Sequence, residues 1–402
     1  MANVRAMGGG RRRFLGVLAG VVAAAGCVLG MCGAAAAQGG AAEPILVGHY
    51  GSMTGKEATF GQSTDRGIQL AIKDINAAGG LNGRPIQLKT YDTKGESKEA
   101  GIAVTRLITD DKVVAVLGEV ASSLSLAGGA VCQQYGVPMI SPSSTNPRVT
   151  AGRDMVFRVC FTDDQQAFAI ARFVRENLKL ERAAVLFDQT QAYSKGLKDD
   201  FNKSFKALGG TVVIEQAYSG GDTDFSAQLT SIKAADPQII FAPGYYTDGG
   251  NIAIQARRLG IGKNVPLIGG DGWDSEQLGK IGGDAIEGAY YSNHTAPDQP
   301  GSGLGQFNER FRSEFGGATP DALAGLGYDA MMVLFDAMKR CQAATGGLKG
   351  KDLAKAIAET KDFPGVTGSI TMDKNRNASK PVVMVQVKNG MPSWVANVPP
   401  KE

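Results

Sequence analysis

The chain has 402 residues, of which 42 are basic and 39 acidic; this length exceeds one ordinary α/β unit, so two domains with separate cores are expected. Four basic residues and no acidic ones fall within the first 37 positions, which leaves 38 basic against 39 acidic residues in the rest. This near-neutral balance gives no support to a nucleic-acid-binding surface or a polybasic membrane surface.

The first 37 residues have the pattern of a signal peptide. Arg5 and the run Arg11-Arg12-Arg13 precede an apolar stretch over 14–29, and alanine-rich sequence follows up to Ala37. We expect cleavage near Ala37 and therefore an exported protein. A weak lipoprotein box before Cys27 leaves a lipid anchor at that residue as the alternative, and the arginine cluster leaves both the general and the twin-arginine export routes open.

Strands and helices alternate from Ile45 onward. The first series has predicted strands over 45–48, 86–92, 113–117 and 137–140. Apolar residues at helical spacing predict the helices between them: one that Gly79-Gly80 ends, one over about 100–108 and one over 125–135. Strands that alternate with helices are typical of parallel sheets.

A second series of the same kind begins at Ala184. Its predicted strands cover 184–188, 211–215, 239–241 and 266–269, and its predicted helices cover 201–208 and 225–235. Two such series predict the fold class α/β, with two doubly wound parallel-sheet lobes whose sheets are covered by helices on both faces.

The segments between the two series look extended. Residues 156–159 and 289–293 are therefore predicted to be crossover strands that join the lobes and form a hinge. Helices after Gln306 and Asp321 are expected to return to the first lobe. The resulting division assigns 1–37 to the signal peptide, 44–160 plus 293–368 to lobe 1, and 161–292 plus 369–402 to lobe 2.

Cysteine usage predicts neither a metal site nor a disulfide framework. Cys27 and Cys32 lie in the predicted signal peptide, so only Cys132, Cys160 and Cys341 remain, and three cysteines allow one disulfide at most. Buried structural thiols are expected, because a domain of this size needs no covalent cross-links. No spacing of cysteines and histidines suggests a metal site, and no motif suggests a cofactor.

Catalytic motifs are missing from the sequence as well. The chain has only two histidines, His49 and His294, and it contains no GxSxG, HExxH or GxGxxG. Residues 346–352 come nearest to a phosphate-binding loop, but their glycine spacing is wrong and no serine or threonine follows the lysine. We therefore expect a protein that is not an enzyme.

Polar side chains follow three of the predicted strands. In open α/β sheets ligands bind beyond the carboxyl ends of the strands, so these residues are candidates for a site. Ser122 stands at a helix start, where backbone N–H groups suit a carboxylate, although a serine there is more often a helix N-cap. Ser143 and Thr145 follow the next strand, and Asp271, set between glycines, could hold an ammonium group.

Four aromatic residues stand in similar loop positions. Phe60, Tyr193, Tyr245 and Trp273 could form the walls of an apolar or cation-binding pocket. Any one of them taken alone is more often a core residue. Together with the hydroxyls and the acid, they predict a site for a small molecule that carries both charges.

At these residues the chain resembles the periplasmic leucine/isoleucine/valine-binding proteins, the type I solute receptors of branched-chain amino-acid ABC transporters. The resemblance covers essentially all of the chain after the signal peptide. It is carried by the following segments: Thr59-Phe60-Gly61, the run Asp74 to Gly83, Ser122-Ser123, the run Ser141 to Pro147, Tyr193-Ser194-Lys195-Gly196 and Gly244-Tyr245.

The resemblance implies a role for each candidate residue. Ser122 looks like the hydroxyl that binds the ligand carboxylate, and Thr145 like the residue that contacts both the carboxylate and the ammonium group. Ser143 would offer its backbone carbonyl to the ammonium group, and Asp271 would be its acidic anchor. Tyr193 and Tyr245 would be aromatic contacts from the second lobe.

Two departures from the family pattern concern the ligand side chain. The family prototype has glutamate where this chain has Asp271, and tyrosine where it has Phe60. The pocket is thereby changed by one methylene and loses one hydroxyl. The clamp for the charged groups of an amino acid survives both changes, whereas the identity of the ligand side chain does not follow.

The resemblance implies a periplasmic receptor that captures a small amino acid by lobe closure and delivers it to the permease of an ABC transporter. A branched-chain or other neutral L-amino acid is the expected ligand, and a monomer is the expected state. An amide, a urea or an aromatic acid remains an alternative ligand, because the same architecture serves many solutes. A ligand sensor for a separate signalling partner is the alternative of another class.

Overall fold

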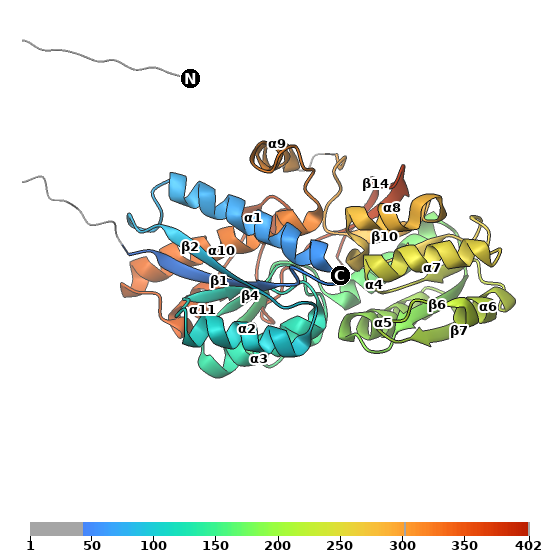
Figure 1. Cartoon of the computed structure of the whole chain (residues 1–402), viewed down its shortest axis with the longest axis horizontal. Coiled ribbons are helices and arrows are strands. Elements are labelled where there is room, and N and C mark those ends of the chain that lie inside the picture. Colours follow the sequence, from blue (N-terminus) through green and yellow to red (C-terminus); the bar gives the residue numbers. More distant parts are fainter. Residues whose placement is uncertain (1–42, 301–302, 401–402) are drawn as a thin grey trace, which may run out of the picture. The chain divides into compact units, whose positions relative to one another are not determined.

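The structure is a computed structural model that describes residues 43–300 and 303–400 (Figure 1). The predicted signal peptide, with its cleavage near Ala37 and the alternative anchor at Cys27, lies outside the described residues. Within the described part, the chain forms two large sheets and one short two-stranded sheet.

The first large sheet has five parallel strands in the order β2-β1-β3-β4-β5. Its strands are β1 (Ile45–Gly51), β2 (Ile86–Asp92), β3 (Ala115–Leu117), β4 (Met139–Ser141) and β5 (Val156–Arg158). The central strands β1, β3 and β4 are buried along almost their whole length, as expected when helices cover both faces. The four strands predicted in the first series are confirmed, and the extended segment predicted over 156–159 forms β5.

Helices cover both faces of this sheet (Figure 1). They are α1 (Ala58–Ala77), α2 (Ser97–Thr109), α3 (Ser122–Tyr135), α10 (Ala322–Thr345) and α11 (Gly350–Ala358), whereas α9 (Leu304–Glu314) packs on α1 and not on the sheet. Helices α1 and α10 contact each other on one face, and α2 contacts α3 on the other. The chain thus returns to the first sheet after residue 303, as the sequence predicted.

Glycines set how closely α1 and α10 approach each other. A Cβ atom added to Gly67 of α1 would lie 2.0 Å from the carbonyl oxygen of Ala324, and one added to Gly327 of α10 would lie 2.4 Å from that of Thr64. No side chain fits at either position. The two helices are therefore in backbone contact beside the sheet.

The second large sheet is mixed, with the strand order β14-β13-β10-β9-β8-β6-β7. Its strands are β6 (Arg182–Asp188), β7 (Thr211–Tyr218), β8 (Ile239–Phe241), β9 (Leu267–Gly269), β10 (Tyr290–Asn293), β13 (Val382–Lys388) and β14 (Met391–Val398). Strands β6 to β10 are parallel and match the predictions, whereas β13 pairs antiparallel with β10 and with β14. This C-terminal hairpin adds an antiparallel edge that the sequence analysis did not predict.

The helices of the second sheet include three α-helices that were not predicted, α4, α7 and α8. The set comprises α4 (Asp163–Arg172) with its π-helical continuation η2 (Phe173–Asn177), α5 (Ala192–Ala207), α6 (Ser226–Ala234), α7 (Tyr246–Arg258), η3 (Asp271–Trp273), α8 (Glu276–Gly282) and η4 (Gly283–Ala285). The short helix η1 (Pro147–Val149) follows β4 of the first sheet. Helix α4 packs against β10 and β13, and α5 against β6 and β7.

Three segments connect the elements of the two sheets: β5 leads into α4, β10 leads toward α9, and β12 leads to β13. The buried Arg158 at the end of β5 donates hydrogen bonds to the carbonyl oxygens of Ser144, at 2.6 Å, and Asn146, at 2.8 Å. Its backbone N–H donates to the carbonyl oxygen of Arg376 on the third segment. The first crossover is therefore tied by hydrogen bonds to the loop after β4 and to the segment that follows β12.

The third crossover begins later than the predicted lobe division at 368/369. That division falls inside the two-stranded sheet of β11 (Phe363–Gly365) and β12 (Gly368–Ile370). Farther along, the backbone N–H of Met372 still donates to Thr360, and Asn377 accepts from the hydroxyl of Thr150. We propose that the chain leaves the first lobe between residue 378 and β13.

The two lobes are in contact along their facing edges. Hydrogen bonds join the elements of the first sheet to those of the second, among them Ser123 Oγ with Gln191 Oε1 at 3.0 Å, Asn146 Nδ2 with Ala192 O at 2.9 Å, Thr59 Oγ1 with Ser275 Oγ at 2.9 Å, and Tyr246 Oη with Lys56 O at 2.8 Å. These contacts define a closed arrangement of the lobes.

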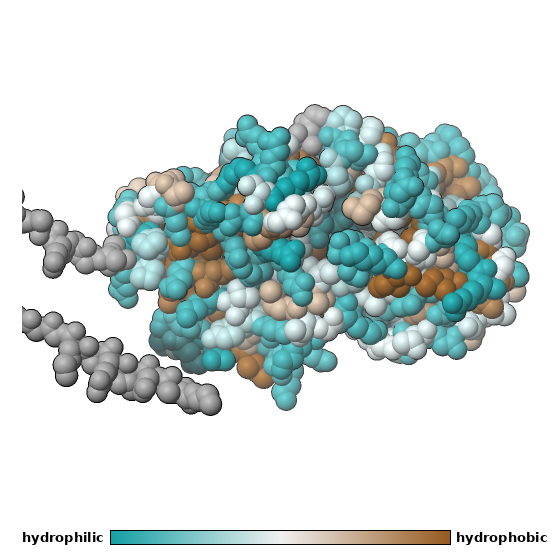
Figure 2. All heavy atoms as spheres, turned by 45° about the horizontal axis from the view of Figure 1, so that its top comes forward, coloured by the Kyte–Doolittle hydropathy of each residue, from teal (hydrophilic) through white to brown (hydrophobic). Residues whose placement is uncertain are grey.

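Hydrophilic side chains cover most of the face shown in Figure 2, and hydrophobic areas lie between them. Large hydrophobic side chains that are strongly exposed are few in the described ranges: Ile102, Tyr135 and Met391. None of the helices over these ranges combines the length and the apolar character that a membrane crossing requires. The three described cysteines, Cys132, Cys160 and Cys341, are buried and free.

Candidate functional site

A small cavity lies between the two lobes, at the carboxyl ends of their strands. Its volume is about 10 Å³, and its lining residues are Phe60, Val120, Ser143, Thr145, Tyr193, Tyr245, Asp271 and Gly272. Six of the eight residues predicted from the sequence are thus brought together around one space. A cavity of this size holds about one water molecule, so a larger ligand enters only when the lobes move apart or the walls rearrange.

Each lobe contributes one wall of the cavity. Ser143 and Thr145 lie directly after β4 of the first sheet, and Phe60 lies in the first turn of α1. From the second lobe, Tyr193 is in the first turn of α5 and Asp271 begins η3, directly after β9. The polar residues come from the strand ends because the parallel sheets place all those ends at one edge.

Asp271 is held by hydrogen bonds on both of its carboxyl oxygens. The Tyr193 hydroxyl donates to Oδ1 at 2.9 Å, and Nε2 of His294 lies 3.1 Å from Oδ2. The backbone N–H of Asp271 donates to Oε1 of Gln166 at 2.8 Å. Because each carboxyl oxygen accepts only one of these bonds, each keeps a lone pair for a ligand.

Buried polar atoms without hydrogen-bond partners gather around this cavity. Among the described residues, they include Oγ1 of Thr145 and the hydroxyl of Tyr245, which both line it. Both carboxyl oxygens of Asp163, Nε2 of Gln166 and Nδ1 of His294 also lack a partner. Buried polar groups are rarely left unpaired in folded proteins, so this concentration marks a place for a polar ligand or for water.

Aromatic rings form one continuous side of the cavity. The ring of Phe60 meets Tyr245 edge-on, with centroids 5.4 Å apart, and Tyr193 stacks on Tyr245 at 5.5 Å. The first of these contacts joins the two lobes. Such a wall suits an apolar side chain or the face of a cation.

Ser122 and Trp273 are the two predicted site residues that do not line the cavity. Ser122 is the first residue of α3 and does not cap it; its hydroxyl accepts a hydrogen bond from the backbone N–H of Asn146 at 3.3 Å. Trp273 is fully buried against two glycines: a Cβ added to Gly269 or Gly249 would lie 2.1 Å or 2.7 Å from its ring. The indole is thus a core residue in this arrangement.

Asp163 is a second carboxyl group in the same region, and it was not predicted. It is the first residue of α4, and its backbone N–H donates to the carbonyl oxygen of Thr145 at 2.9 Å. Burial raises the pKa of Asp163 well above its ordinary value, and the nearby Asp271 raises it further. No sequence pattern pointed to Asp163, because α4, the helix that it begins, was not predicted.

Four further residues at the site were also missed. Val120 and Gly272 line the cavity, but the sequence analysis predicted Ser122 and Asp271, which lie beside them in the sequence, as site residues instead. Gln166 lies on the unpredicted α4 and accepts from both Asp271 and the hydroxyl of Ser292, so it ties the site to β10. His294 was noted only as one of two histidines, and no sequence pattern placed it at the site.

A larger cavity, of about 370 Å³, lies at another part of the lobe contact. It is bordered by Thr59 and Ser63 of α1, by Asp274 after η3 and by Asp321 before α10, and it includes none of the eight predicted residues. Asp274 accepts a hydrogen bond from the backbone N–H of Ala322 at 2.8 Å, and Asp321 accepts one from Ser63. The buried acids of this cavity are therefore already paired within the protein.

The small cavity combines a carboxyl group from the second lobe with a hydroxyl group from the first. Asp271 offers acceptors to a cation, and the hydroxyl of Thr145 is free to bond either charged group. Over the described ranges, no group of three or more histidine, cysteine, aspartate or glutamate side chains is arranged to hold a metal ion.

Comparisons with known proteins identify the family of the chain. The periplasmic binding protein family model matches residues 44–391. The Leu/Ile/Val-binding protein BraC3 of Rhizobium johnstonii is 31% identical over 335 residues, which cover 81% of this chain and 87% of that protein. The resemblance predicted from the sequence is therefore confirmed.

Solved structures give the same result. A leucine-binding protein, LivK, of Thermotoga maritima has a TM-score of 0.83 and 38% identity, and the match covers 89% of this chain and 99% of that one. The branched-chain amino acid transporter substrate-binding protein LivJ of Streptococcus pneumoniae, in complex with isoleucine, has a TM-score of 0.80 and 32% identity over 89% and 99%. The predicted two-lobed fold is confirmed, and the chain belongs to the periplasmic binding protein family.

Proposed function

We propose that this chain binds a neutral L-amino acid between its lobes and delivers it to the permease of an ABC transporter. The observation that carries the proposal is the set of buried, unpartnered polar groups around the cavity that Asp271 and Thr145 line. The names of its relatives support the same ligand class, because they are leucine-, isoleucine- and valine-binding proteins.

In this proposal, Asp271 anchors the ammonium group, and the carbonyl of Ser143 adds a second acceptor. Thr145 contacts both charged groups, and Ser122, at the N-terminus of α3, binds the carboxylate once its present bond to Asn146 is exchanged. Phe60, Tyr193 and Tyr245 cover the ligand side chain. Trp273 supports this wall from behind.

Lobe closure follows from the position of the ligand between the lobes. A ligand that contacts groups of both lobes binds the closed state better than the open one, so it shifts the equilibrium toward closure. The crossover segments after β5, β10 and β12 serve as the hinge. The closed form is then the form that the permease recognises.

The remaining features of the proposal rest on the family and the sequence. Residues 1–37 act as the export signal, and the receptor works in the periplasm, as a monomer and without chemistry of its own. A lipid anchor at Cys27 remains the alternative to a free periplasmic form.

A thermal-shift panel on ligand-stripped protein tests the proposed ligand class. At about 100 times its Kd, a ligand of the native state stabilises the fold by about 2.7 kcal/mol, which is visible as a rise in Tm. We expect leucine, isoleucine, valine or another neutral L-amino acid to give this shift, and the D-enantiomers to give none.

The same panel includes the alternative ligands. Amides, urea and aromatic acids such as benzoate lack the ammonium group that Asp271 is proposed to hold, so they should leave Tm unchanged. A shift with one of these compounds and with no amino acid would move the function to that solute class. A panel in which no solute raises Tm would favour the sensor or another role.

A further inference from the structure

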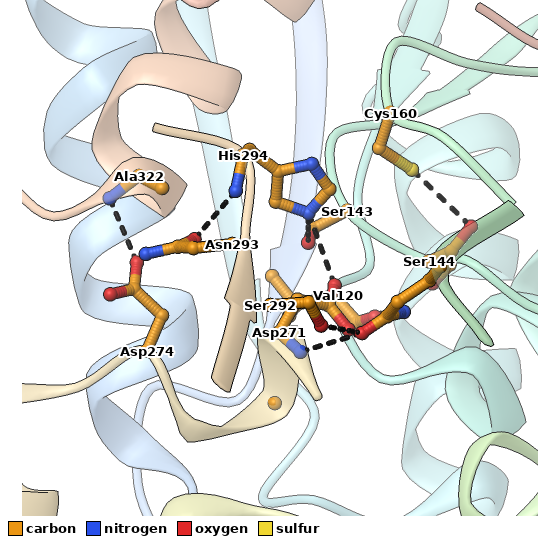
Figure 3. A network of polar contacts seen from close by, with 12 residues as sticks. Val120, Ser143, Ser144, Cys160, Asp271, Asp274, Ser292, Asn293, His294 and Ala322 are labelled. Atoms are coloured by element: carbon orange, nitrogen blue, oxygen red, sulfur yellow. Dashed lines mark hydrogen bonds and ion pairs between the residues drawn. The ribbon is translucent and has the colours of Figure 1, made fainter. Parts of the chain in front are cut away.

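His294 stands behind the ligand cavity, where the chain leaves β10 and crosses between the lobes (Figure 3). Its Nε2 atom lies 3.1 Å from Oδ2 of Asp271 in the second lobe and 3.4 Å from the hydroxyl of Ser143 in the first. The ring stacks on Phe161 of the first crossover, with centroids 4.0 Å apart. One imidazole thus contacts a cavity-lining residue of each lobe and two crossovers.

The surroundings of the ring decide which nitrogen carries the proton. Nε2 faces a carboxyl group, which accepts hydrogen bonds, whereas Nδ1 is buried and has no partner among the described residues. Leaving a buried N–H without an acceptor costs more free energy than leaving a buried nitrogen lone pair without a donor. The proton therefore belongs on Nε2. In this form His294 is neutral and donates to Asp271.

We propose that His294 is a positioning residue for the ligand's ammonium group: its neutral Nε2–H orients Asp271 toward the cavity, and its protonation weakens the binding of a cationic group. This inference rests on the proposed function, because it assumes that Asp271 faces an ammonium group. The proposal means that His294, a residue of the hinge, directly influences the affinity for the ligand. No motif in the sequence indicates that influence.

The charged and titratable groups around the ring set the direction of its pKa. Burial lowers the pKa of His294, Asp271 raises it in part, and the charge of Lys380 on the third crossover lowers it again. Cys160 of the first crossover stays neutral, because burial raises its pKa to about 12. Lys380 itself is buried, 4.0 Å from Asp329 of α10. His294 is therefore neutral at neutral pH and becomes charged only in acid.

The sign of the pH effect follows from these charges. A protonated His294 beside Asp271 compensates the charge that attracts an ammonium group, and it also repels that group directly. The affinity for an amino acid therefore falls as the pH falls through the pKa of His294. Asp163, whose pKa burial raises, changes the affinity in the same direction, so the wild type must be compared with a variant that keeps Asp163.

Calorimetric titration of the wild type, His294→Gln and His294→Leu between pH 7.5 and pH 4.5 tests the proposal, with the amino acid of highest affinity in the panel. Glutamine retains an N–H donor but does not titrate, whereas leucine removes the donor. At pH 7.5, we expect His294→Leu to bind about tenfold more weakly than the wild type, and His294→Gln to recover part of that loss. Between pH 7.5 and 4.5, the wild type should lose about tenfold more affinity than His294→Gln.

His49→Gln is the matched control, because His49 is the other histidine of the chain and pairs with Asp65 at 2.9 Å, away from the cavity lining. It should keep the pH profile of the wild type. The proposal is overturned if the wild type and His294→Gln have the same pH profile, or if His294→Leu binds as tightly as the wild type. Should His294→Leu not fold, the comparison with His294→Gln still decides.

A measurement without ligand separates this inference from the proposed function. With only two histidines in the chain, NMR of the imidazole nitrogens identifies the His294 tautomer and its pKa directly. We expect the Nε2–H form and a lower pKa in Asp271→Asn than in the wild type; the Nδ1–H form would contradict the proposal. If the NMR result holds and no amino acid binds, the proposed ligand fails while the contact between His294 and Asp271 stands.

Discussion

The two cavities at the lobe contact differ in how their buried polar groups are paired. Around the small cavity, Thr145, Asp163 and Tyr245 hold polar atoms without partners among the described residues. At the larger cavity, Asp274 and Asp321 both accept hydrogen bonds from the protein itself. Unpaired groups are costly unless a ligand or water satisfies them, so the small cavity is the place where ligand contacts can gain most.

The larger cavity bears on the closure of the lobes rather than on ligand contacts. Asp274 comes from the second lobe, and its partner Ala322 begins α10 of the first lobe, so this contact exists only when the lobes are together. Burial raises the pKa of Asp274 to about 7, and the neighbouring Asp321 is the second cause. Protonation of Asp274 therefore affects the contact between the lobes at the larger cavity, away from the small cavity.

Replacement of Asp271 should have the largest effect on binding. Asp271→Ala removes the proposed anchor of the ammonium group, and the loss of one member of a buried charge pair costs roughly 2–5 kcal/mol. We expect calorimetric binding of the amino acid to be lost or weakened by about 100-fold or more. The Tm without ligand should fall only moderately, because the buried Tyr193 hydroxyl and His294 lose a shared acceptor.

Asp271→Asn is the isosteric control for that variant, since it keeps the size of the side chain and one acceptor oxygen. It should also bind weakly, because the charge is gone. A large fall in the ligand-free Tm of Asp271→Ala would instead mark Asp271 as a structural residue. Undiminished binding by Asp271→Asn would separate the site from the ammonium group altogether.

Thr145→Val should have a moderate effect that appears in binding alone. The Thr145 hydroxyl is buried and makes no hydrogen bond of ordinary length to a described residue, but it lies near enough to Asp163 to lower the pKa of that carboxyl group, so valine removes only a weak contact from the folded protein. The variant should lose about tenfold in affinity, the value of one hydrogen bond to a charged group, while its Tm without ligand stays equal or rises. Titration calorimetry and thermal melting measure the two quantities.

Thr64→Val provides the matched comparison, because the Thr64 hydroxyl in α1 is also buried without a partner but does not line the small cavity. It should affect stability much as Thr145→Val does and leave affinity unchanged. If both variants lose affinity equally, the unpaired hydroxyl of Thr145 is no marker of the ligand site.

Asp274→Asn should have the smallest effect, and on stability rather than on affinity. The unfolded carboxyl group ionises near pH 4 and the buried one near pH 7, so Asp274 makes the folded state progressively less stable as the pH rises from about 4 to about 7. The asparagine variant lacks this penalty. Its free energy of unfolding relative to the wild type should increase by about 1 kcal/mol or more between pH 5 and pH 8.

Urea denaturation at the two pH values measures that difference. Other buried acids contribute to the pH dependence of both proteins, and they cancel in the comparison. A constant difference between wild type and Asp274→Asn across this range would contradict the assigned pKa. A difference of opposite sign would mean that the Asp274 charge stabilises the closed lobes.

The strands of both lobes could be predicted because apolar runs bounded by glycine or polar residues occur at regular intervals. The hairpin of β13 and β14 was missed, although Asn389-Gly390 between two alternating segments is a strong hairpin signal. Helix α4 was missed because its sequence begins with two aspartates and two glutamines and shows little apolar face. Periodicity alone therefore underestimates elements that carry polar contacts.

The site was predictable where its residues follow strands, as Ser143, Thr145 and Asp271 do. The positions of Gln166 and His294 in the site were not predictable. Both residues contact Asp271 only because the fold brings together segments that are more than 20 residues apart in the sequence. Trp273 is a predicted ligand contact that does not line the small cavity in this arrangement. Its sequence position suggests a pocket wall, but Gly249 and Gly269 leave a space that the indole fills.

The central claim is that the closed lobes hold both charged groups of an amino acid. Calorimetric titration of ligand-stripped protein with L-leucine, with 3-methylbutylamine and with 4-methylpentanoic acid tests it most directly, because the two analogues each retain only one charged group. We predict binding of leucine and a loss of at least about 100-fold for each analogue. Equal affinity for leucine and either analogue would contradict the claim.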